Sequence, residues 1–364
     1  MDPYEARRRL YTAEELLDGF DPDSSLGFTS TRDFVIFRRF VLDGASTPGS
    51  LEVRRRQAVH DAGISWALGA HLDRSRPLVG VMGGHKVARD DPAYRQVALL
   101  ARHLTRKGFL VATGGGPGAM EAAHLGAAFA HVDVAALDQA CEVLRSHARL
   151  PDLSQPLFEP DGSIKPDRKA VLEEANRWLT VALEARRLCP SPCGDSLAIP
   201  TWRYGQEPTT PFATAYAKYF QNSIREEALV AKSWAGIVYA RGGGGTLREI
   251  FQDVEENYYA ADAARFTPMI FFDPDGYWQN DPEIGPDGAL RRRGVKIDHV
   301  LGKVFALARA ASGDTEACLA KVRFTLDVDE IVGLLQAQVP TAEGNLALML
   351  EGRAAELPAA SWNR

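Results

Sequence analysis

Two glycine-rich segments have the composition and position of phosphate-binding loops. Gly114–Gly118 follows an apolar run at 109–113, Gly242–Gly245 follows another at 235–239, and a helical pattern comes after each. Glycine lets the backbone approach a phosphate closely, and a helix N-terminus offers free N–H groups with partial positive charge. Together with the pair that ends the run at 78–82, the glycines that could contact an anion are Gly83, Gly84, Gly114, Gly115, Gly116, Gly118, Gly242, Gly243, Gly244 and Gly245.

Neither glycine segment matches a better-known nucleotide motif. The G-x-G-x-x-G spacing of dinucleotide sites is missing, and no Gly-Lys-Ser/Thr follows as in a P-loop. Two such loops in one sheet favour a mononucleotide or sugar-phosphate site. The alternative is that the glycines only permit tight turns between strand and helix.

Several polar side chains lie beside these loops. Thr246 and Glu249 form a capping-box pattern at the start of a helix, so Glu249 could serve only as a cap. Glu121 could contact a ribose or base, or cap its own helix. Arg225 has no acidic residue three or four positions away, which favours a ligand role over a salt bridge within its helix. Thr113 could contact phosphate or cap a helix, and His85 is a weaker candidate.

The elements that would position these residues alternate between strand and helix. Strands are predicted at 78–82, 109–113, 235–239, 268–272 and 322–326, with helices at 91–107, after Gly118, at 212–234, at 247–259 and at 329–338. This order predicts an α/β fold: a doubly wound, mostly parallel, Rossmann-like sheet with helices on both faces. The predicted domain spans 76–338.

Three further segments lie outside this strand–helix pattern. An N-terminal helical extension covers 1–75, with a capping box at Thr12–Glu15, a short strand at 34–37 and an amphipathic helix at 51–70. A proline-rich insertion covers 131–211, with helices near 134–146 and 169–185, and is expected to pack beside the sheet. The tail is 339–364.

Charge and composition exclude several classes of function. The chain has 364 residues, a net charge of −6 and four cysteines. An acidic chain is a poor candidate for binding a nucleic acid polymer over a broad face. No apolar leader or long apolar stretch is present, so we expect a cytoplasmic protein without a membrane partner. Cys189 and Cys193 could form a metal knuckle, but two reduced thiols in a loop are the simpler interpretation.

The two loops together carry a resemblance to a known family. Gly114-Gly-Gly-Pro-Gly-Ala-Met-Glu121 and Gly242-Gly-Gly-Gly-Thr-Leu-Arg-Glu249 resemble the two motifs of the LOG family, above all its larger nucleotide nucleosidases. The first loop is one residue shorter than in the short members of the family. Arg241 stands where those members have proline. The resemblance covers about residues 76–130 and 212–335.

The resemblance implies a function that the residues alone do not specify. LOG proteins include phosphoribohydrolases, which hydrolyse nucleoside 5′-monophosphates to free base and ribose 5-phosphate. Their two signature catalytic positions correspond to Arg225 and Glu249. The resemblance further implies no metal, no cofactor and a homodimer or higher homo-oligomer. The alternative is a non-catalytic protein of the same fold that binds a nucleotide or molybdenum cofactor.

Overall fold

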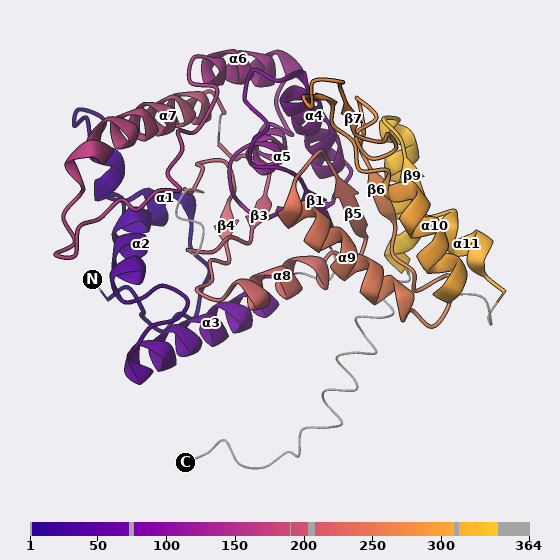
Figure 1. The fold of residues 1–364 in the computed structure, drawn as a ribbon, viewed down its shortest axis with the longest axis horizontal. Coiled ribbons are helices and arrows are strands. Elements are labelled where there is room, and N and C mark those ends of the chain that lie inside the picture. The colour runs from indigo at the N-terminus through magenta and orange to yellow at the C-terminus, as the bar shows by residue number, and fades with distance from the viewer. Residues whose placement is uncertain (1, 73–75, 190, 203–207, 309–312, 341–364) are drawn as a thin grey trace, which may run out of the picture.

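The computed structural model describes residues 2–72, 76–189, 191–202, 208–308 and 313–340. Its centre is a seven-stranded parallel sheet in the order β4-β3-β2-β1-β5-β6-β9 (Figure 1). The strands are β1 Leu78–Met82, β2 Leu110–Thr113, β3 Ser196–Ala198, β4 Ala215–Tyr216, β5 Gly236–Tyr239, β6 Met269–Phe271 and β9 Val322–Phe324. The predicted α/β class is confirmed.

Helices cover both faces of this sheet, and its strands other than β9 are buried. In β1, Leu78 and Met82 join one hydrophobic core and Val79 and Val81 join the other. The first core is covered by α3 Leu51–His71, α8 Asn222–Val230, α9 Gly244–Tyr258 and α10 Ile297–Ala308. The second is covered by α4 Pro92–Arg106, α5 Ala119–Ala128, α6 Val134–Arg145, α7 Lys169–Arg187 and a helical segment that includes residues 328–340.

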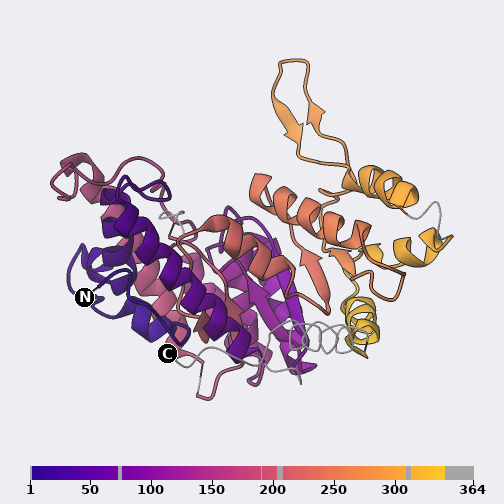
Figure 2. The ribbon, with the colours of Figure 1, turned by 90° about the horizontal axis from the view of Figure 1, so that it is seen from below.

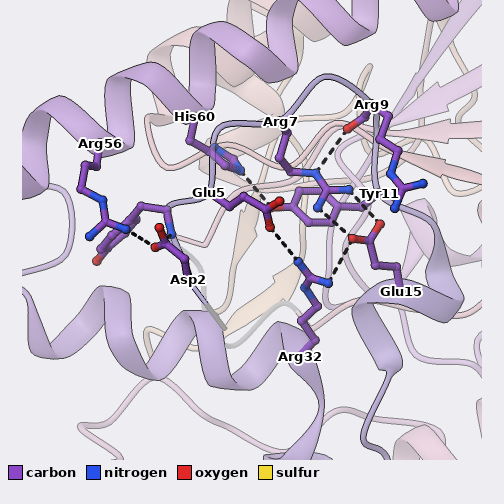
Figure 3. Close-up of polar contacts among 10 residues, drawn as sticks. Asp2, Glu5, Arg7, Arg9, Tyr11, Glu15, Arg32, Arg56 and His60 are labelled. Atoms are coloured by element: carbon purple, nitrogen blue, oxygen red, sulfur yellow. Dashed lines mark hydrogen bonds and ion pairs between the residues drawn. The ribbon is translucent and has the colours of Figure 1, made fainter.

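The N-terminal extension is fastened to the β4 edge of the sheet. Tyr11 and Tyr216 exchange backbone hydrogen bonds of 3.0 and 2.9 Å, so the extension covers an edge that would otherwise be unpaired. Arg7 lies 3.6 Å over the Tyr11 ring and donates two 2.8 Å hydrogen bonds to Glu15, while the Tyr11 hydroxyl lies 2.9 Å from His60 of α3 (Figure 3). These contacts hold α1 Ala13–Leu17 and α3 together.

The extension and the insertion also share a third hydrophobic core. It joins Leu17, Phe28 and Phe34 of the extension to residues of the insertion, which are Leu153, Leu157, Phe158, Leu172, Ala175, Trp178 and Leu179. Short 3-10 turns η1 Gly27–Ser30 and η2 Pro166–Arg168 flank this core. The insertion is therefore supported on one side by the sheet's helices and on the other by the extension.

Two smaller features complete the fold. β7 Glu283–Ile284 and β8 Leu290–Arg292 form an antiparallel hairpin that extends away from the body (Figure 2). α11 Thr315–Leu319 precedes β9. No helix in the described ranges has the length and apolar composition needed to cross a bilayer.

One predicted strand proves to be a helix. Residues 34–37 lie inside α2 Arg32–Leu42, whose N-cap Thr31 accepts a hydrogen bond from the Phe34 backbone N–H. The aromatic and β-branched run has strand propensity, but Ile36 and Phe40 lie four positions apart in the first core, and Phe34 and Phe37 lie three positions apart at the third. The cap and this spacing explain why residues 34–37 form a helix.

The predicted helix over 212–234 is also wrong in its first half. Residues 215–216 form β4, and helix α8 begins only at Asn222. The Asp61 carboxylate, from α3, accepts hydrogen bonds of 3.0 and 2.9 Å from the backbone N–H groups of Phe220 and Gln221. A contact across 159 residues thus fixes where the helix begins.

The stretch predicted as an insertion contributes to the sheet as well. β3 lies within 131–211 and pairs in parallel with β2 on one side and β4 on the other. Both strands are too short to give a recognisable pattern in the sequence. The two helices expected in this stretch are present as α6 and α7.

Candidate functional site

The glycine pair Gly83–Gly84 and the second glycine loop meet where the strand order changes direction. β1 lies between β2 and β5, so the chain leaves β1 toward one side of the sheet and later returns on the other. Ligands of doubly wound folds bind at such a switch point, beyond the carboxyl ends of the strands. The backbone N–H of Gly84, just after β1, donates a 2.9 Å hydrogen bond to the carbonyl of Arg241, which precedes the second loop.

A cavity of about 570 Å³ opens at this junction. Its size falls within the ~300–1,000 Å³ of ordinary small-molecule sites. The walls combine the predicted residues Gly83, Gly84, Arg225, Gly242, Gly243, Gly244, Gly245, Thr246 and Glu249 with His85, Lys86, Val87, Met120, Glu226, Arg241, Tyr277 and Arg293. We call it the main cavity.

Arg225 and Glu249 form an ion pair on the wall of the main cavity. Arg225 Nη1 donates to Glu249 Oε1 at 3.0 Å, and the two side chains are 8% and 9% exposed. Gly114 makes room for this arginine, since a Cβ there would lie 2.5 Å from Arg225 Nη2. The first glycine loop therefore acts by seating Arg225, and the sequence prediction of direct phosphate contact at Gly114 stays untested.

The second glycine loop forms the first turn of α9. The helix starts at Gly244, and its N-cap Gly243 provides no side-chain cap. Thr246 lies inside the helix, so the capping-box interpretation of Thr246 and Glu249 is wrong. The first backbone N–H groups of an α-helix have no partner within it, and here they border a cavity. This is an arrangement that binds anions.

Alanine substitutions at the glycines of this turn should affect the stability of the helix and its affinity for an anion differently. A Cβ at Gly245 would meet nothing within 4 Å, so Gly245→Ala should stabilise α9 by up to about 1 kcal/mol. Gly245 lines the main cavity, so the added methyl should hold an anion away from the backbone N–H groups and weaken binding of inorganic phosphate roughly tenfold or more, because a hydrogen bond to a charged group contributes about 1.5–3 kcal/mol. Calorimetry and thermal unfolding measure the two effects.

The control for this prediction is Gly242→Ala. A Cβ at Gly242 would lie 2.1 Å from Thr246 Oγ1, so this variant should lose stability. Unchanged phosphate affinity in Gly245→Ala would show that the anion does not bind at the start of α9.

The rest of the first glycine loop lies away from the main cavity. Gly115, at φ +75°, packs against Ala198, where a Cβ would come within 2.9 Å of the Ala198 Cβ. Gly116 is buried and borders no described cavity. Gly118 and Glu121 line a second cavity of about 520 Å³. The Thr113 hydroxyl bonds the Gly115 N–H and His124, at 2.8 Å each, so it supports the loop from within.

Glu121 is held in a buried ion pair. Arg89 donates to its two carboxylate oxygens at 2.9 and 2.6 Å, and the Tyr94 hydroxyl donates at 3.0 Å. The side chains of Arg89 and Glu121 are 1% and 0% exposed. The N-cap of α5 is Gly118, so Glu121 does not cap this helix as one sequence interpretation suggested.

The sequence pattern missed several cations of the main cavity. The guanidinium of Arg241 forms ion pairs with Asp91 and Asp275, at 2.7 Å each, so its charge is balanced by carboxylates. Lys86 and Arg293 have no ion-pair partner among the described residues, and they give the cavity unpaired positive charge. Arg293 belongs to the Arg291–Arg293 run, which resembles a solvated surface in the sequence. Its position beside the cavity depends on the β7–β8 hairpin.

His85 borders both cavities. Desolvation lowers the pKa of His85 below its ordinary value of 6.5, and the neighbouring charge of Lys86 lowers it further. The imidazole is therefore mostly neutral at pH 7 and able to accept or donate a hydrogen bond.

A buried carboxyl group supports the helix that carries Glu249. Asp253, one turn further along α9, accepts a 2.6 Å hydrogen bond from Tyr239 of β5 and a 3.2 Å one from Asn257. Burial raises the pKa of Asp253 from 3.8 to about 7. The folded state thus holds this proton more tightly than the unfolded chain does.

This pKa predicts a pH dependence of stability. A carboxyl whose pKa rises on folding contributes stability at low pH that is lost as the pH rises, here between about pH 4 and 7. Asp253→Asn should remove this loss. The difference in unfolding free energy between the variant and wild type should therefore favour the variant more at pH 8 than at pH 4.5. Urea unfolding at the two pH values measures it. Asp262→Asn, on the surface, should leave the dependence unchanged, and an equal dependence in Asp253→Asn would refute the assignment.

The described residues contain no group of three or more His, Cys, Asp or Glu side chains that could hold a metal ion. Cys189 and Cys193 form no disulfide, and their sulfurs lie 2.8 Å apart. Comparison with known proteins adds no assignment: no family model matches the chain, and no curated protein matches it.

Proposed function

We propose that the protein hydrolyses the N-glycosidic bond of a nucleoside 5′-monophosphate and releases free base and ribose 5-phosphate. The observation that carries the proposal is the Arg225–Glu249 pair, 3.0 Å apart, on the wall of a cavity that also contains the first turn of α9. An anion site and a carboxylate thus border the same space. The two LOG-like motifs in the sequence support the same activity.

Each group has a task in this reaction. The phosphate binds at the N-terminus of α9, with Lys86 and Arg293 as further cations. As the bond from C1′ to the base breaks, its electron pair leaves with the base and positive charge develops on the ribose. The Glu249 carboxylate stabilises this charge and orients the attacking water. The water oxygen bonds to C1′, and the released proton ends on the base.

Arg225 positions both the Glu249 carboxylate and the substrate. Its guanidinium holds the Glu249 carboxylate in place, and as a planar, permanently charged fork it also suits the ligand's phosphate or ribose hydroxyls. The pair is nearly buried, so its field acts on the ribose with little screening by solvent.

A second candidate is a protein that binds a nucleotide without turnover. Glu249 is paired with Arg225, and this neutralises part of its charge. Arg241 likewise holds two carboxylates beside the cavity. A structural carboxylate of this kind would orient the arginine for binding alone.

A screen of nucleoside monophosphates distinguishes the two. The purified protein is incubated with AMP, GMP, CMP and UMP, and free base and ribose 5-phosphate are measured by chromatography. Equimolar release of both products supports hydrolysis. Tight nucleotide binding with no product supports the second candidate, and neither binding nor release contradicts both. Sedimentation analysis of the same sample tests the homodimer that the resemblance implies.

A further inference from the structure

The second cavity lies beside the main one. The two share His85, Lys86 and Val87, which follow β1. The main cavity alone contains the start of α9, and the second cavity alone contains residues 148–154 of the insertion. The shared segment is therefore the border between an anion-binding end and an end built by the insertion.

The outer wall of the second cavity is firmly attached. Arg89 donates its backbone N–H to the carbonyl of Ala148 at 2.9 Å, and its Nη1 to the carbonyls of His147 and Trp178 at 3.2 and 3.0 Å. Leu153 of the same wall belongs to the core shared by the extension and the insertion. These contacts make the second cavity a preformed space, because its wall is fixed from both sides.

The lining of the second cavity suits a heteroaromatic ring. Val87, Pro117, Leu150, Pro151 and Leu153 provide apolar surface. Exposed polar side chains lie among them: Lys86, Arg149, Asp152 and Ser154. Mostly apolar walls with a few polar groups are what a planar base with a hydrogen-bonding edge needs.

The position of the second cavity fits the base, which is the leaving group of the reaction. A nucleotide whose phosphate lies at the start of α9 has its ribose beside Glu249 and Arg225. Its base would extend away from the phosphate, and the second cavity lies beside the main one at the shared segment His85–Val87. At about 520 Å³ this cavity has room for a two-ring base.

We propose that the second cavity is the subsite for the leaving base and that it selects purine over pyrimidine nucleotides. This inference rests on the proposed function. It makes residues 148–154 of the insertion the determinants of base preference, while α9, Arg225 and Glu249 hold the phosphoribosyl part.

The test compares ribose 5-phosphate, which lacks the base, with complete nucleotides. Ribose 5-phosphate fills only the main cavity, whereas AMP and CMP would also enter the second. Ser154→Trp places a large ring in the second cavity, and Ser146→Trp, at the exposed end of α6 and in neither cavity, is its control. Calorimetry with the full chain carrying Glu249→Gln measures binding of all three ligands without turnover.

We expect Ser154→Trp to weaken AMP binding roughly tenfold or more, to weaken CMP less, and to leave ribose 5-phosphate unchanged. Ser146→Trp should change none of them. Arg149→Trp, paired with the exposed control Arg145→Trp, repeats the test if Ser154→Trp does not fold. Unchanged AMP affinity in the cavity variants, or an equal loss for ribose 5-phosphate, overturns the subsite. Failure of ribose 5-phosphate and every nucleotide to bind the Glu249→Gln chain counts against the proposed function itself.

Discussion

Replacing Glu249 with Gln should lower the rate of base release from a nucleoside monophosphate by about 10²–10⁴-fold, the usual contribution of a positioned acid or base. The amide keeps the size of the side chain, and its oxygen still accepts the hydrogen bond from Arg225. It carries no negative charge to stabilise the ribose cation. The loss should therefore appear in kcat, with nucleotide affinity largely kept.

Glu255→Gln is the matched control for this experiment. Glu255 lies on the same helix, is exposed and borders neither cavity. It should keep wild-type kinetics. Rates are followed by chromatography of the free base, and circular dichroism checks that both variants are folded. A Glu249→Gln protein with full activity would refute the catalytic role assigned to this residue.

Replacing Glu121 with Gln should destabilise the fold by about 3–5 kcal/mol, the typical effect of removing one partner of a buried ion pair. Arg89 would remain with its charge at 1% exposure. The new amide N–H₂ group would also face a guanidinium that can only donate. The stacking of Arg89 on Trp178, at 4.1 Å from the ring centroid, would be strained by the same change.

The chain contains an exposed pair of similar geometry as a control. Arg95 binds Asp138 with two hydrogen bonds of 2.7 and 3.1 Å, but the side chains are 47% and 41% exposed. Asp138→Asn should cost less than about 1 kcal/mol, because water solvates and screens the freed charge. Urea unfolding of both variants gives the comparison. Equal losses would show that burial does not set the contribution of the Arg89–Glu121 pair.

Local sequence patterns determined five of the seven strands of the sheet. The apolar runs that became β1, β2, β5 and β6 are buried, the run that became β9 is partly buried, and the helices between them carry caps such as Asp91. Alternation of such runs with helices allows few arrangements besides a parallel sheet. The position of the glycine loops after β2 and β5 followed from the same pattern.

Tertiary contacts decided where local preference was weak or misleading. Residues 34–37 have strand propensity, yet lie in α2 because their apolar side chains face two cores at helical spacing. Residues 212–221 lack a helix breaker, yet pair as β4 and end at the Asp61 carboxylate. In the second case the deciding carboxylate lies 159 residues away in the sequence.

The candidate site shows the same division. By itself the sequence determined the glycine loops and, through its motifs, singled out Arg225 and Glu249. Only the tertiary structure showed that these two bind each other across 24 residues, that Glu121 is engaged by Arg89, and that Lys86 and Arg293 border the main cavity. Backbone conformation depends largely on neighbouring residues and is readable from spacing. Which side chains meet depends on how the sheet order brings loop ends together, and no local pattern contains that information.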